Sequence, residues 1–264
     1  METVRSKDGT TIAYDRVGHG PALILVDGAL CYRASGPMEA LATELAPHFT
    51  VIRYDRRGRG DSTDSLPYRL EREIEDLDAL ITVAGGSAFV CGLSSGAVLA
   101  LEAAARGLSV HKLALYEAPF IVDNSHPPLP ADFLTRLNAA LATNRRGDAV
   151  RLFLKLVGLP GFGVALMRLL PAWSKLEAVA HMLPYDISIV GDYQQGRPLP
   201  ADRWASLQAS ALVLDGGKSP AWMRIATASL ASVLPGARYV TLAGQTHMVK
   251  AKVLAPVLTE FFAA

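Results

Sequence analysis

The sequence alternates short, uniformly apolar runs with longer segments whose apolar residues recur every three or four positions. Runs without polar alternation are typical of parallel strands buried on both faces, and the longer segments have the periodicity of amphipathic helices. Strand and helix in alternation predict a doubly wound α/β fold. Six parallel strands are expected at residues 22–26, 50–54, 88–91, 112–116, 211–214 and 238–242, and helices at 38–45, 70–83, 97–106, 223–234 and 254–262.

Two parts of the chain depart from this alternation. Residues 2–6 and 11–17 flank an Asp-Gly turn and predict an antiparallel hairpin. The long interval before the fifth of these strands has helical spacing but no convincing strand pattern, which predicts a helical cap over the sheet; the alternative is helices packed on its outside. The expected division is a core of residues 1–117 and 211–264 and a cap of residues 118–210, with helices at 130–142, 148–157, 163–169 and 175–182.

Composition narrows the class of partner. Half of the 264 residues are hydrophobic and the formal net charge is +1, a balance that fits a globular fold and lacks the basic footprint of nucleic-acid binding. No apolar leader or membrane-length apolar stretch is evident. Two cysteines, Cys31 and Cys91, cannot form a disulfide framework or a metal site and favour a cytoplasmic protein. We expect a monomer or homodimer.

The arginine-rich segment 53–62 follows a predicted strand. It lacks the lysine and the spacing of a phosphate-binding loop, and no dinucleotide fingerprint follows the first parallel strand. Its arginines are therefore expected to make salt bridges and packing contacts. No cofactor is predicted.

The strongest chemical signal is Gly92-Leu93-Ser94-Ser95-Gly96, between the predicted strand 88–91 and the helix that follows it. Strand, G-x-S-x-G and helix together are the context of a nucleophile elbow, a sharp turn that lifts the serine above the sheet. Side chains at Gly92 and Gly96 would crowd such a turn. The pattern indicates Ser94 as a catalytic nucleophile.

A serine nucleophile needs a base, and six histidines are available. Only His247 lies between the last predicted strand and the final helix, where a loop would bring it to the carboxyl edge of the sheet. His181, in the cap, is a candidate for lining the pocket. The other four are interpreted as structural or surface residues.

The carboxylate that would orient His247 is less certain from the residues. Asp215 ends the next-to-last strand, which places it early for reaching the imidazole. Glu117 follows the strand beside the nucleophile strand, and its longer side chain can cross one strand spacing of about 4.8 Å. Glu117 is the leading candidate, with Asp215 and a dyad without an acid as alternatives.

Acyl transfer also requires donors for the developing oxyanion. The Ser95 N–H is one candidate, and the other is the N–H of Gly28 or Ala29, after the first parallel strand. Asp27 is expected to brace this loop by hydrogen bonding. The pocket is predicted to be lined by cap and loop side chains, although core packing is the alternative for them: Trp173, His181, Tyr185 and Trp222.

With these motifs the chain resembles the α/β-hydrolase family over nearly its whole length. The resemblance implies an eight-stranded, mostly parallel sheet with a cap inserted after the sixth strand. The family's usual acid position is occupied here by Ser219. The short motifs around Ser94 and Asp27 are similar to those of zearalenone lactonases, in which the acid is a glutamate at the place of Glu117.

The predicted function is hydrolysis of a carboxylic ester or lactone of a hydrophobic small molecule through an acyl-enzyme. One alternative keeps the fold but uses His247 as the base of a lyase, cofactor-free oxygenase or cyclase. The other is a binding protein with an inactive triad, because a fold alone does not fix function.

Overall fold

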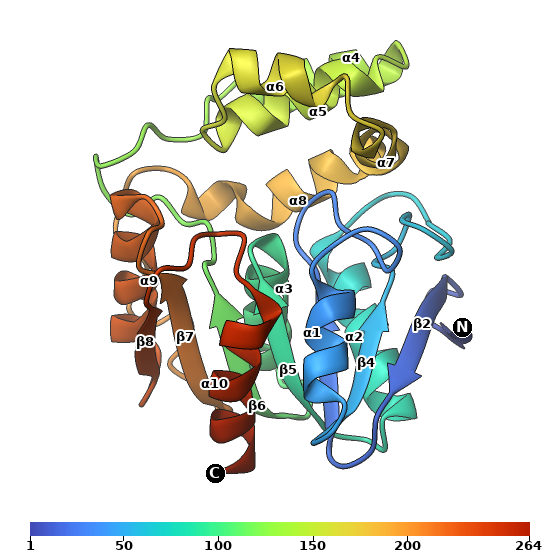
Figure 1. The fold of residues 1–264 in the computed structure, drawn as a ribbon, viewed down its shortest axis with the longest axis vertical. Coiled ribbons are helices and arrows are strands. Elements are labelled where there is room, and N and C mark those ends of the chain that lie inside the picture. Colours follow the sequence, from blue (N-terminus) through green and yellow to red (C-terminus); the bar gives the residue numbers. More distant parts are fainter.

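The computed structural model describes all 264 residues and contains one eight-stranded sheet in the order β1-β2-β4-β3-β5-β6-β7-β8 (Figure 1). β1 and β2 form the antiparallel hairpin, and β2 pairs antiparallel with β4. All pairs from β4 to β8 are parallel, which confirms the predicted sheet. The strands are β1 (Glu2–Arg5), β2 (Thr11–Val17), β3 (Ala22–Val26), β4 (Thr50–Tyr54), β5 (Ala88–Leu93), β6 (Val110–Tyr116), β7 (Ser210–Gly216) and β8 (Arg238–Leu242).

Helices cover both faces of the sheet. Alternate residues of β3 explain why: Leu23 and Leu25 belong to the apolar cluster under α1 and α10, whereas Ile24 and Val26 belong to the cluster under α2, α3 and α9. Both faces of the strand are therefore dry, as its uniformly apolar sequence predicts. The covering helices are α1 (Met38–Leu45), α2 (Leu70–Val83), α3 (Ser95–Ala105), α9 (Ala221–Val233) and α10 (Ala251–Ala263).

The chain between β6 and β7 forms a helical cap beyond the carboxyl ends of the strands (Figure 1). It has an apolar cluster of 13 buried residues of its own, to which the core contributes Leu30. None of its helices, nor any other in the chain, has the length and apolar character needed to cross a bilayer. The cap helices are α4 (Phe133–Ala142), α5 (Arg146–Leu156), α6 (Gly161–Met167), α7 (Ala172–Val179) and α8 (Leu183–Val190), with short 3₁₀ turns at Ala180–Met182 and Gly191–Tyr193.

One cap helix, α8, has no counterpart in the sequence analysis. It lies between the other cap helices and the sheet, in contact with α3 and α4 (Figure 1). Its sequence is apolar around most of the helix, which obscures helical periodicity, and it contains Pro184. That proline lies in the first turn, where the missing N–H would have had no helical partner, so it starts the helix and does not break it.

Candidate active site

Ser94 lies at the turn between β5 and α3 in a strained backbone conformation, with φ 57° and ψ −126°. A Cβ atom on Gly92 would lie 2.4 Å from the Gly96 carbonyl oxygen, and one on Gly96 would lie 2.3 Å from the Val26 carbonyl oxygen. Both positions therefore require glycine, as the motif predicts. The serine side chain is partly exposed at the edge of the sheet.

Glu117 directly follows β6, the strand beside β5, and is also in a left-handed conformation, with φ 46°. Its carboxylate is fully buried and accepts three hydrogen bonds. Oε2 lies 2.7 Å from His247 Nδ1, and Oε1 accepts the Gly216 N–H at 2.7 Å and the Ser219 hydroxyl at 2.5 Å. These donors compensate for the burial of the charge.

The contact with Glu117 assigns the roles of the two histidine nitrogens. Because a carboxylate only accepts, Nδ1 carries the proton, and Nε2 is left as the basic nitrogen. The His247 side chain is 39% exposed and lies in the loop between β8 and α10. No hydrogen bond joins it to Ser94 in this structure, a common finding in sites without substrate.

Asp215 takes no part in this contact. Its Oδ2 accepts a hydrogen bond from the Tyr239 hydroxyl, and its side chain is fully buried. Ser219, at the position where the family resemblance implies an acid, donates its hydroxyl to Glu117. The structure thus brings Glu117 and not Asp215 to the histidine.

The loop after β3 approaches the serine closely. A Cβ atom on Gly28 would lie 3.0 Å from Ser94 Cβ and 3.6 Å from its Oγ, so this glycine faces the nucleophile. Ser95 is the first residue of α3, and its N–H has no partner within the helix. The N–H groups of Ser95 and of Gly28 or Ala29 can therefore meet near Ser94, with the positive end of the α3 dipole beside them.

Asp27 does not brace this loop as the sequence suggested. Its carboxyl is buried, Oδ1 has no hydrogen-bond partner, and burial raises its pKa to about 7 against the opposing effect of Arg59 and Arg56. The bracing comes instead from those arginines, which donate to backbone carbonyls: Arg59 to Gly28 O at 2.6 Å and Arg56 to Asp27 O at 3.3 Å.

All four arginines of segment 53–62 are ion-paired, which confirms the prediction of salt bridges; Arg53 is half-buried, and Arg56, Arg57 and Arg59 are buried. Arg56 and Arg59 both contact Asp186 of α8, a residue that the sequence analysis did not single out. The available signal was a lone acid inside the apolar run Leu183–Val190, since buried carboxylates are rare unless paired.

The four residues predicted to line the pocket lie in different surroundings. Trp173 is buried in the cap's apolar cluster and donates its indole N–H to Glu177. Tyr185 stacks on Tyr68 and donates to Asp64, and His181 Nε2 donates to the carbonyl of Gly58. Trp222 packs against His126. A role in substrate binding stays a prediction for all four.

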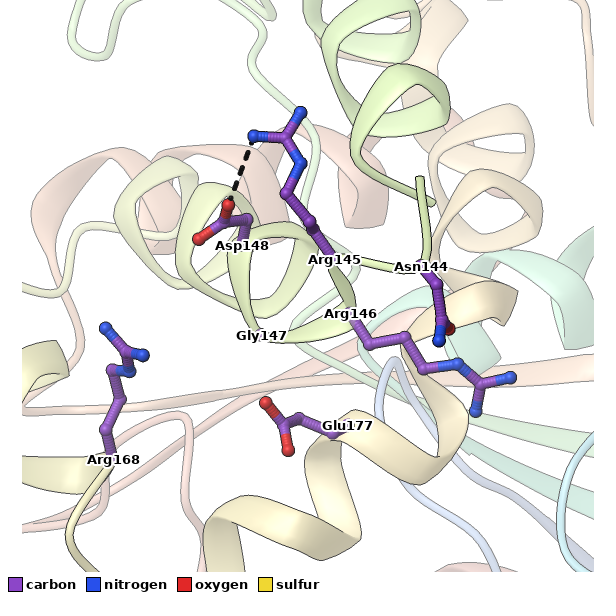
Figure 2. Close-up of a pocket in the computed structure, with 7 residues that line it drawn as sticks. All are labelled: Asn144, Arg145, Arg146, Gly147, Asp148, Arg168 and Glu177. Atoms are coloured by element: carbon purple, nitrogen blue, oxygen red, sulfur yellow. Dashed lines mark hydrogen bonds and ion pairs between the residues drawn. The ribbon is translucent and has the colours of Figure 1, made fainter. Parts of the chain in front are cut away.

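An open recess of about 390 Å³ lies on the cap (Figure 2). It is lined by polar and charged residues and by glycine, and it includes none of the predicted site residues. Arg145 is paired there with Asp148, and Glu177 is already bonded to Trp173. A charged recess of this kind does not match a hydrophobic substrate. Its lining is Asn144, Arg145, Arg146, Gly147, Asp148, Arg168 and Glu177.

Comparison with known proteins gives consistent matches. A model of the alpha/beta hydrolase family matches residues 17–250. An alpha/beta hydrolase of known structure from Sphaerobacter thermophilus DSM 20745 is 55% identical, with a TM-score of 0.92, over 99% of this chain and 100% of that one. The enol-lactonase from Burkholderia xenovorans LB400 is 22% identical, with a TM-score of 0.71, over the full length of both chains, and shares the fold.

A curated relative matches part of the chain. The pimeloyl-(acyl-carrier protein) methyl ester esterase of Xanthomonas campestris pv. campestris (strain B100) is 34% identical over 141 residues, which is 52% of this chain. The match spans 53% of the relative, about half its length.

Proposed function

Because the chain belongs to the alpha/beta hydrolase family, we propose that it hydrolyses a carboxylic ester or lactone of a hydrophobic small molecule through an acyl-enzyme. The observation that carries this proposal is the 2.7 Å contact between Glu117 and His247 Nδ1, combined with Ser94 at a glycine-flanked elbow. Nucleophile, base and acid come from the carboxyl ends of β5, β8 and β6, which meet at one edge of the sheet.

The proposed reaction follows the roles that this geometry allows. Ser94 Oγ attacks the carbonyl carbon while His247 Nε2 takes its proton, and Glu117 holds the tautomer and stabilises the imidazolium. The Ser95 N–H and the N–H of Gly28 or Ala29 stabilise the oxyanion. The imidazolium then protonates the leaving alkoxide, and a water molecule, deprotonated by the same nitrogen, cleaves the acyl-enzyme to acid and free serine.

An apolar substrate is supported by what lies over the oxyanion loop. Leu30 is buried in the cap's cluster, and its neighbours Ala29 and Tyr32 pack against the same cluster. Apolar side chains therefore extend from the cap to the proposed oxyanion donors, and pockets for small molecules are mostly apolar with a few polar groups. The name of the 34% identical relative, an ester hydrolase, supports ester chemistry as well.

The test is covalent labelling with a fluorophosphonate together with turnover of p-nitrophenyl esters of increasing chain length. We expect labelling and turnover in the natural protein, and neither in Ser94→Ala. Labelling without turnover of any ester or lactone would favour non-hydrolytic chemistry with His247 as the base. A protein that is not labelled at all would fit the inactive-triad alternative and contradict the proposal.

A further inference from the structure

We infer that Asp186 is a positioning residue that ties the seating of the cap to the geometry of the oxyanion hole. The inference rests on the proposed function and adds to it a residue outside the triad. Asp186 lies on α8, the cap helix nearest the sheet, and its side chain is 2% exposed.

The Asp186 carboxylate accepts four hydrogen bonds, all from residues of the core domain. Oδ1 accepts from Arg56 Nη1 at 2.7 Å, from Arg59 Nη2 at 2.9 Å and from the Ser95 hydroxyl at 2.7 Å, and Oδ2 accepts from Arg59 Nη2 at 2.8 Å. Ser95 is the residue whose N–H is one proposed oxyanion donor. One side of the oxyanion hole is therefore held directly by the cap.

The other side is held through the two arginines. Arg56 donates to the carbonyl of Asp27, and Arg59 donates to the carbonyl of Gly28. In a planar trans peptide the C=O and the following N–H point in opposite directions, so fixing the Asp27 carbonyl orients the Gly28 N–H, and fixing the Gly28 carbonyl orients the Ala29 N–H. Both candidate donors of the loop thus depend on side chains that Asp186 holds in place.

The charges in this buried cluster balance. Arg56 also forms a bidentate pair with Glu73 at 2.7 and 2.8 Å, so two guanidinium groups face two carboxylates. Burial by itself would raise the pKa of Asp186, but Arg59, Arg56 and the Ser95 hydroxyl outweigh it and hold the pKa below its usual value. An asparagine would lack the charge and would turn N–H donors toward guanidinium groups that are donors themselves.

The test compares Asp186→Asn with Asp132→Asn, which removes an exposed carboxylate elsewhere on the cap. For a p-nitrophenyl ester, Asp186→Asn should lower kcat on the order of tenfold to a hundredfold with KM within about threefold, because misplaced oxyanion donors weaken transition-state binding more than substrate binding. Inhibition by a trifluoromethyl ketone, whose bound adduct carries an oxyanion, should weaken by the same factor. Asp132→Asn should match the natural protein in all three.

A second variant and an activity-independent readout guard against simple misfolding. Ser95→Ala keeps the peptide N–H and removes only the hydroxyl, which donates to Asp186 and accepts a longer bond from Arg56 at 3.4 Å. It should lower kcat by about threefold to tenfold while the protein stays folded. Amide hydrogen exchange in residues 27–31 should become faster in Asp186→Asn than in Asp132→Asn. Unchanged kcat in folded Asp186→Asn and Ser95→Ala, or unchanged exchange in residues 27–31, overturns the inference.

These readouts separate the inference from the proposed function. If the natural protein hydrolyses no ester and Ser94 is not labelled, the proposed function fails. The exchange measurement in residues 27–31 then still decides whether Asp186 holds the loop.

Discussion

Replacing Glu117 by glutamine keeps the shape of the side chain but removes the charge that faces His247. The Gly216 and Ser219 donors hold an oxygen at Oε1, so the amide nitrogen of the glutamine must take the place of Oε2. An N–H donor there requires Nδ1 of His247 to accept, which moves the ring proton to Nε2. The nitrogen that should take the proton of Ser94 is then already protonated.

The expected loss of kcat follows from two changes: His247 adopts the wrong tautomer, and its imidazolium loses the ion pair with Glu117. A wrong tautomer in a serine hydrolase triad lowers kcat by roughly 10⁴-fold, equivalent to about 5.5 kcal/mol in the activation barrier. The imidazolium also loses a fully buried counter-ion, and the two effects act on one step, so they do not add. We therefore expect Glu117→Gln to reduce kcat by about 10³- to 10⁴-fold with KM little changed.

The assay is turnover of a p-nitrophenyl ester from pH 6 to 10, with circular dichroism to check folding. Asp215→Asn is the matched control, because Asp215 is another buried carboxylate at a neighbouring strand end and bonds to Tyr239. Its kcat should stay within about threefold of the natural protein. A folded Glu117→Gln enzyme within tenfold of natural kcat, or a larger loss in Asp215→Asn than in Glu117→Gln, would refute the reasoning.

Three further predictions follow from the site. Adding Ser219→Asp to Glu117→Ala should restore activity at least tenfold over Glu117→Ala alone, because Ser219 Oγ already contacts the carboxylate that Glu117 presents to the histidine; no gain in kcat would contradict this. Gly28→Ala places a Cβ 3.0 Å from Ser94 Cβ, and it should lower kcat on the order of a hundredfold in a protein whose thermal midpoint stays close to the natural one. Asp27 keeps its proton up to about pH 7 in the folded protein but loses it near pH 3.8 in the unfolded chain. The folded state therefore binds more protons between these pH values, and the free energy of unfolding should fall as pH rises from about 4 to 7, on the order of 4 kcal/mol. Urea unfolding at pH 4 and pH 8 should show this fall in the natural protein and not in Asp27→Asn; equal pH dependence in both would exclude Asp27 as the source.

Local patterns were sufficient for the sheet and for the elbow. The apolar runs gave each parallel strand to within about two residues at either end, because burial on both faces leaves a composition that short segments display by themselves. Gly92 and Gly96 flank Ser94 at a turn where the surrounding backbone leaves no room for a Cβ atom, and the local motif is enough to recognise this turn. His247 could be predicted as the base because it follows the last strand, and the topology of a parallel sheet places that loop at the carboxyl edge.

Contacts between residues that lie far apart in the sequence were harder to predict. Glu117 emerged as a candidate because a charge at the end of a buried strand needs a partner, but the residues left Asp215 open as well. Asp186 and helix α8 were missed, since the reason for a carboxylate there is a pair of arginines about 130 residues earlier in the chain. Asp27 was expected to form hydrogen bonds that the neighbouring arginines make in its stead.

Three of the four non-glycine residues with positive φ lie in or beside the candidate active site: Leu30, Ser94 and Glu117. Each such conformation is on the order of 1–3 kcal/mol less favourable than an ordinary one, and glycine would relieve that strain. At Leu30 and Glu117 the relief is offset, because glycine would also remove a side chain that is packed in the cap's apolar cluster or that satisfies three buried donors. Directed evolution that ranks clones by heat resistance alone should therefore enrich glycine at Ser94, the partly exposed nucleophile. Thermotolerance and turnover would have to be selected together in this protein.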